Sequence, residues 1–221
     1  MEGMDMGSMD MPPEPPSVAR FAGLFAMWLA MMSAMMLPTI FPMVGAFAAI
    51  NRVRRSRDAP YVATAFFVLG YLIAWSGYSA LAVAVQWGLE SAGLLDGMME
   101  STTRTLGGVL FLLAGLYQWT PLKEVCLARC RSPVGFVLTE WRDGPLGALV
   151  MGLRHGMFCI GCCGALMLLL FAVAVMNLLW VAALTVLVMA EKLLPGGRWL
   201  RHVIGAGLTL AGLVLLGGAL L

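Results

Sequence analysis

Residues 145–190 read PLGALVMGLRHGMFCIGCCGALMLLLFAVAVMNLLWVAALTVLVMA, and Arg154 is the one Asp, Glu, Lys or Arg among them. As a single helix this stretch would extend roughly 69 Å, more than twice the hydrocarbon thickness of a bilayer. We therefore predict two membrane-spanning helices here, at about 146–168 and 173–194, with a turn near 173–177. An ionisable residue at membrane depth, such as Arg154, is by default a candidate for function.

The rest of the chain has the same apolar character. Of all residues in the chain, 61% are hydrophobic and only 12% are charged, whereas a soluble domain carries about a quarter charged residues. Further uncharged stretches of spanning length cover residues 21–50, 61–89, 105–122 and 203–221. We therefore predict an all-α membrane protein with a Met- and Pro-rich outer tail at residues 1–19. A single six-helix transmembrane bundle would follow at residues 20–221.

The lysines and arginines predict how these helices are oriented, because positive residues concentrate in cytoplasmic loops. Six spans with both termini outside would place most of them in inner segments: Arg52, Arg54, Arg55, Arg57, Lys123, Arg129, Arg131, Arg142, Lys192, Arg198 and Arg201. Five spans would place the last three outside, so six spans fit better. The net charge of +2 is too small to suggest a nucleic-acid partner. The expected partner is the lipid bilayer.

The strongest chemical signal lies in the first of the two helices predicted within residues 145–190. His155, Cys159, Cys162 and Cys163 are offset by four, seven and eight residues, which places them on one face of a regular helix. Met151 lies one turn earlier on the same face. Imidazole with thiolate suits Zn²⁺, whereas thiolate with thioether suits Cu(I), so the pattern predicts a soft-metal site. The alternative is that these cysteines only pack as small hydrophobic residues and the histidine is hydrogen-bonded in the bundle.

A second cysteine pair, Cys126 and Cys130, is also spaced by four residues and lies among basic residues. Nearby positive charge favours the thiolate form, which could bind metal or take part in disulfide exchange. The alternative interpretation is two reduced cysteines with no chemical role.

Methionine is the third feature of the sequence, with 18 residues in the chain. Five of them lie in the polar N-terminal tail, where a flexible thioether cluster could collect Cu(I) on the outer side: Met1, Met4, Met6, Met9 and Met11. Met31 and Met35 lie one turn apart in the first helix, and we expect one of them to complete the metal site, although such a stripe is more often packing. Pro38 and Pro42 are expected to kink or break that helix.

These motifs resemble a bacterial family of predicted metal-binding integral membrane proteins with a domain of unknown function. The matching stretches are Trp28–Pro38, Pro121–Cys130 with Arg131 and Pro133, His155–Cys163, Met176–Trp180 and Glu191–Lys192. The resemblance covers roughly residues 21–195 and implies a multi-pass protein of the bacterial inner membrane. It supplies no catalytic residue, and the sequence contains no phosphate-binding loop or nucleophile elbow. A binding protein is therefore expected rather than an enzyme.

Three functions are compatible with these features. The leading hypothesis is binding or transport of a transition metal, copper before zinc, through Cys, His and Met ligands, with a membrane-protein or metallochaperone partner. The second is a membrane thiol–disulfide redox protein, although a cytoplasmic pair faces a reducing compartment. The third is a non-catalytic accessory subunit of a larger membrane complex.

Overall fold

The computed structural model describes residues 18–55, 62, 64–95, 104–173, 177–194 and 197–218, and these contain helices but no β-strand. In chain order the helices are α1 (Val18–Arg55), α2 (Thr64–Ser91), α3 (Arg104–Tyr117), α4 (Pro121–Arg131), α5 (Pro133–Glu140), α6 (Gly144–Met167), the 3₁₀ helix η1 (Leu168–Phe171), α7 (Leu178–Leu193) and α8 (Gly197–Gly217). The predicted all-α class is therefore confirmed for this part of the chain. The tail methionines lie outside the described residues.

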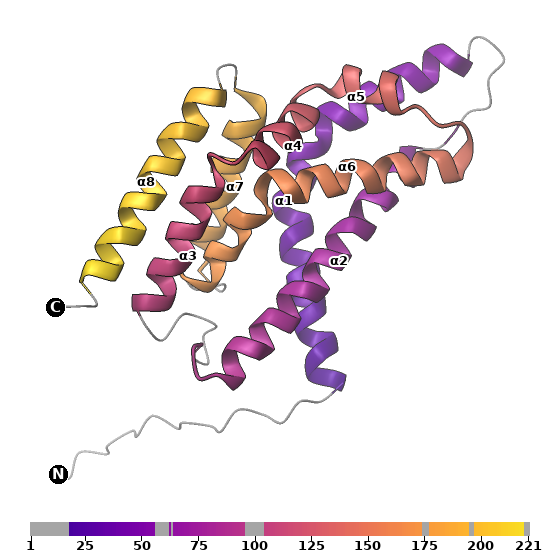
Figure 1. Cartoon of the computed structure of the whole chain (residues 1–221). Helices are drawn as coiled ribbons and strands as arrows, with labels where there is room; N and C mark the ends of the chain where they lie inside the picture. Colours follow the sequence, from indigo (N-terminus) through magenta and orange to yellow (C-terminus); the bar gives the residue numbers. More distant parts are fainter. Residues whose placement is uncertain are drawn as a thin grey trace, which may run out of the picture.

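The first helix is bent but not interrupted. α1 runs through both Pro38 and Pro42, and Figure 1 shows its ribbon changing direction along its length. Proline lacks the N–H that a helix interior requires, and its ring crowds the carbonyl four residues earlier, so it bends a long helix. Of the two outcomes expected at these prolines, the structure has the kink.

Two helices are found where two membrane spans were predicted within residues 145–190, but only the first is long and apolar enough to be a candidate span. α6 continues as η1 to Phe171, and α7 begins after Asn177, whose side chain accepts a hydrogen bond from the backbone N–H of Leu179 at 3.1 Å. The turn was predicted near 173–177, and residues 174–176 lie outside the described residues. Asparagine is a favoured helix N-cap because its side-chain oxygen satisfies a free N–H of the first turn.

Within the described residues, four helices are long and apolar enough to cross a membrane, namely Val18–Arg54, Thr64–Ser91, Gly144–Phe171 and Trp199–Gly217. A fifth crossing is formed if α3 and α4, which are bent by 66° at their junction, make up one broken span. α7 has 16 residues, fewer than a bilayer-spanning helix usually needs. The described residues therefore hold four or five candidate spans, against six predicted.

Close backbone contacts join the helices in two main pairs, α2 with α6 and α3 with α8. In the first pair, a Cβ atom added at Gly152 would lie 1.9 Å from the Phe67 carbonyl oxygen. In the second pair, a Cβ atom at Gly115 would lie 2.6 Å from the backbone nitrogen of Thr209. Small residues at such positions let two helix backbones approach closely, which is how helices pack in an apolar environment.

The helix ends also share a common arrangement. In Figure 1, the first turns of α1 and α3 and the last turns of α2 and α8 lie toward the lower side of the view.

At the opposite end of α1, Asp143 accepts hydrogen bonds from Trp141 at 2.9 Å and from Arg54 at 2.7 Å. These two donors hold the pKa of the Asp143 carboxyl below its ordinary value.

Candidate metal centre

Three thiols gather on one face of α6. Cys159, Cys162 and Cys163 follow an i, i+3, i+4 spacing, and their sulfur atoms all lie within 4.8 Å of one another. Each residue is at most 1% exposed. The thiols of Cys162 and Cys163 donate to the Cys159 carbonyl oxygen at 3.1 and 3.0 Å, which directs both sulfurs back along the helix. The predicted shared face therefore brings these three cysteines together.

Two further sulfur atoms reach this group from other helices. Cys130 of α4 lies with its sulfur 3.8 Å from that of Cys162, and Met36 of α1 lies with its sulfur 3.8 Å from that of Cys163. The bend between α3 and α4 aims α4 across α6, and Thr120 caps the new helix by accepting from the Lys123 N–H at 3.3 Å. Five sulfur atoms from three helices are thus neighbours, and we call this group the sulfur cluster: Met36, Cys130, Cys159, Cys162 and Cys163.

A buried lysine contacts the sulfur cluster. Lys192 is 7% exposed, and its Nζ lies 3.0 Å from the Cys159 sulfur and 3.0 Å from the Thr39 hydroxyl oxygen. The Tyr71 hydroxyl lies 3.2 Å from the same sulfur. An ammonium group at this distance in a dry interior strongly stabilises negative charge on the sulfur atom. Cys159 is therefore placed to be a thiolate ligand.

The neighbouring carboxylate is engaged elsewhere. Glu191 is 1% exposed, and both of its oxygens accept from the Lys123 ammonium group, at 2.7 and 3.0 Å. This leaves the Cys159 sulfur as the one potentially anionic partner in the contacts described for Lys192. The structure buries the side chains of three residues that the positive-residue pattern predicted in inner segments, Lys123, Lys192 and Arg201.

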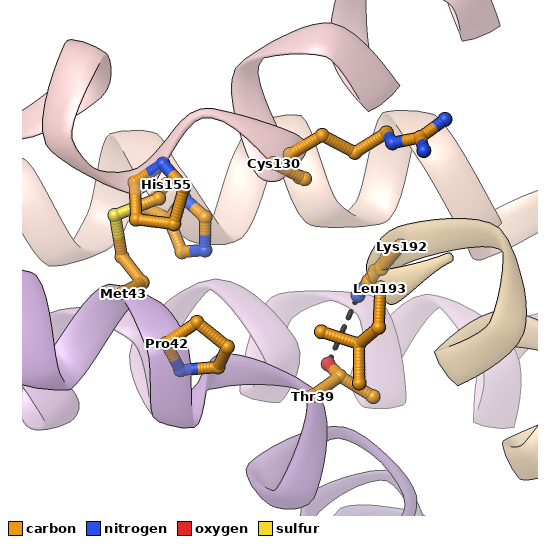
Figure 2. A pocket seen from close by; sticks show the side chains of 9 residues that line it. Thr39, Pro42, Met43, Cys130, His155, Lys192 and Leu193 are labelled. Atoms are coloured by element: carbon orange, nitrogen blue, oxygen red, sulfur yellow. Dashed lines mark hydrogen bonds between the residues drawn. The ribbon is translucent and has the colours of Figure 1, made fainter. Parts of the chain in front are cut away.

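His155 is not a member of the three-thiol group, whose ligand atoms all lie within 4.8 Å of one another. Its ring packs against Phe136, Tyr71 and Phe67, with centroid distances of 5.2, 5.9 and 6.1 Å. It is 4% exposed, and its Nδ1 atom has no hydrogen-bond partner in the described part of the chain. Figure 2 shows the ring at the wall of a pocket of about 210 Å³, which Cys130 and Lys192 also line.

The other predicted site residues are distributed around the sulfur cluster. The Met151 sulfur accepts from the Arg142 backbone N–H at 3.3 Å, at the beginning of α6. Cys126 is buried against Gly161, where an added Cβ atom would lie 2.5 Å from its sulfur. Met35 is buried and Met31 partly buried in the apolar core, and neither has a described hydrogen bond with a cluster thiol.

Arg154 is also not part of the sulfur cluster. Its side chain is 48% exposed and forms an ion pair with Glu140 of α5. The sequence did not single out Met36, Thr39, Tyr71 or Lys192 as site residues. Met36 belongs to the methionine run that was identified, and Lys192 could have been recognised as a lysine at the end of an apolar helix.

A comparison with protein families adds to this geometry. The family model described as PpoB2: Copper chaperone matches residues 25–215. The chain belongs to this copper chaperone family. No curated protein and no solved structure matches the chain.

Membership of the PpoB2 copper chaperone family and the three-cysteine group both support copper binding. They also support the metal-binding resemblance stated from the sequence motifs. The donor set fits Cu(I), because thiolate and thioether sulfur are the ligands that this ion prefers.

Proposed function

We propose that this chain binds Cu(I) as cargo at the sulfur cluster and passes it to a partner within or across the membrane. The observation that carries this proposal is the convergence of five sulfur atoms from α1, α4 and α6 beside a buried lysine. Membership of a copper chaperone family supports the same function.

Ligand chemistry favours Cu(I) over Zn²⁺, because the cluster consists of thiol and thioether sulfur atoms, which are soft ligands. A Cu(I) ion held by two thiolates carries one net negative charge, and the Lys192 ammonium group beside Cys159 would neutralise it. Burying an uncompensated charge is costly, so this lysine supports a Cu(I) thiolate centre at this position.

We propose that the bundle lies in the bacterial inner membrane with six spans and both termini outside. Exposed apolar side chains support this, for example Leu178 at 79%, Leu146 at 78% and Val214 at 65%, because soluble proteins rarely leave large apolar surfaces uncovered. The helix ends that share one side in Figure 1 fit this orientation. The N-terminal methionines would then collect Cu(I) on the outer side, and a metallochaperone or membrane protein would be the partner.

Anaerobic titration of detergent-purified protein with Cu(I), in competition with a Cu(I) chelator, tests the proposed function. We expect one tightly bound Cu(I) per chain, with sulfur atoms alone in the first shell by X-ray absorption. Zn²⁺ should compete poorly, because the cluster offers soft ligands and one balancing cation. A protein that retains Zn²⁺ in the presence of Cu(I), or that binds no Cu(I), would contradict the proposal.

The proposed orientation predicts where inserted reporters become accessible. Reporter fusions at Arg55 and Gly197 should report the cytoplasm, and a fusion at Gly97 should report the outer side. An outer location for Gly197 would reduce the chain to five spans and reverse the direction of α8.

The redox alternative rests on one contact, the 3.8 Å between the Cys130 and Cys162 sulfurs. We expect acid-quenched alkylation of growing cells to find Cys126 and Cys130 as free thiols, because a cytoplasmic pair faces a reducing compartment, and the same experiment should find Cys162 unbridged to Cys130. A stoichiometric disulfide, or quinone-linked turnover, would instead favour thiol–disulfide chemistry.

A further inference from the structure

One pocket connects the sulfur cluster with the ends of α4 and α7. Its wall includes Cys130 and Arg131 at the end of α4, His155 of α6, and Lys192 near the end of α7, with Met43 of α1 on another side. Figure 2 shows Cys130 and Lys192 on the same pocket as the His155 ring. Cys130 therefore belongs both to this pocket and to the sulfur cluster, where its sulfur lies 3.8 Å from Cys162.

The pocket carries positive charge. Arg131 and Lys192 both line it, and the described lining residues contain no aspartate or glutamate. The nearest acidic neighbour in sequence, Glu191, is already paired with Lys123 at 2.7 Å. Arg131 donates one hydrogen bond to the Leu194 carbonyl oxygen, and Lys192 donates to two acceptors. A guanidinium has five N–H groups and an ammonium three, so both retain donors for a ligand.

A positively charged pocket repels a bare copper cation but attracts an anion. A Cu(I) ion held by two small thiolates is an anion, and carboxylates on the thiol skeleton add negative charge that a guanidinium can bind directly. Its soft centre suits transfer to another sulfur. The apolar wall that Met43 and Pro42 provide would accommodate the carbon skeleton of such a ligand.

We propose that this pocket receives copper as a Cu(I) complex of a small anionic thiolate, such as glutathione, and that Cys130 accepts the ion from it. This inference rests on the proposed function and names the form in which the cargo arrives. It assigns to Arg131 the recognition of the carrier, and to Cys130 the first contact with the ion that this carrier delivers, as a route separate from collection by the N-terminal methionines on the outer side.

The transfer is a ligand exchange without a change in oxidation state. The Cys130 sulfur forms a Cu–S bond while one Cu–S bond to the carrier breaks, and the released carrier thiolate takes the proton of the Cys130 thiol. Copper remains Cu(I) throughout. The ion then lies beside Cys162 and can pass to the remaining sulfurs by further exchanges of the same kind.

The test compares two carriers and two arginines. Purified full-length protein receives Cu(I) from one of two carriers, and the rate of Cu(I) transfer to the protein is measured. Glutathione is the anionic carrier, and 2-mercaptoethanol is the carrier whose skeleton has no carboxylate. Arg131→Gln should slow transfer from glutathione by about 10-fold or more, and transfer from 2-mercaptoethanol by less than about 2-fold. Arg129→Gln is the matched control, because Arg129 lies on the same helix over the Phe158 ring and does not line the pocket.

The equilibrium Cu(I) affinity of both variants, measured with a chelator, should equal that of the unaltered protein. Equal slowing with both carriers, or no slowing by Arg131→Gln, would overturn the inference while leaving Cu(I) binding intact. Loss of Cu(I) affinity in Arg131→Gln would also overturn it, because Arg131 would then act on the metal centre itself. Absence of Cu(I) binding by the unaltered protein would instead overturn the proposed function.

Discussion

Replacement of Cys159 by serine is expected to remove retained Cu(I) from the purified protein, with a loss of affinity of at least about 100-fold. Cys159 contacts the Lys192 ammonium group at 3.0 Å and the Tyr71 hydroxyl at 3.2 Å, so it is the thiol placed to carry negative charge. A serine hydroxyl is a hard and weakly acidic ligand that would neither bind Cu(I) nor balance the lysine. The measurement is Cu(I) affinity by chelator competition, with copper per chain by elemental analysis.

Cys126→Ser provides the matched control for this experiment. Cys126 is also a buried cysteine, 6% exposed, but its sulfur packs against Gly161 and has no described hydrogen bond with a cluster thiol. This variant should keep its copper. Equal loss of copper in both variants would place the metal between the two cysteine motifs, whereas retention by Cys159→Ser would exclude Cys159 as a ligand.

Replacement of Lys123 by methionine is expected to destabilise the fold by about 3–5 kcal/mol, because it would leave a buried carboxylate without its partner. Lys123 and Glu191 are 0% and 1% exposed and join α4 to α7. Reversible unfolding in mixed micelles, followed by tryptophan fluorescence, would measure the loss. The Cu(I) affinity of Lys123→Met should fall as well, because α4 carries both Lys123 and Cys130.

A double variant separates the charge from the packing. Replacing both partners, Lys123→Met with Glu191→Leu, should recover most of the stability, because two apolar side chains of similar volume carry no desolvation cost. Arg54→Met is a surface control: its partner Asp143 is exposed, and exposed ion pairs contribute little. A double variant as unstable as Lys123→Met would show that packing, and not the buried charge, controls this contact.

Residue periodicity and spacing predicted the structure correctly where a feature depends on residues close together in the chain. The break between α6 and α7 follows from the length of residues 145–190, and the bend of α1 follows from Pro38 and Pro42. The three thiols of α6 could be grouped because residues three and four apart share one side of any helix.

Predictions that depended on contacts between helices were less complete. His155 shares a helical face with Cys159, and only the structure showed that its ring also packs against aromatic side chains from α2 and α5. The methionine that reaches the thiols from α1 is Met36, whereas Met31 and Met35 were expected. A one-residue difference rotates a helical position by about 100°, and only the packing of α1 on α6 selects which methionine faces the thiols.

The amino-acid sequence by itself thus determined the helical class, the bend of α1, and the grouping of three thiols on α6, because each follows from local spacing or composition. Only the tertiary structure decided that Cys130 joins this set while Cys126 packs against Gly161. It also placed Lys192 beside Cys159, while the adjacent Glu191 pairs with Lys123. The physical reason is that an interior lysine requires a partner, and which partner it finds depends on how α1, α4, α6 and α7 pack together.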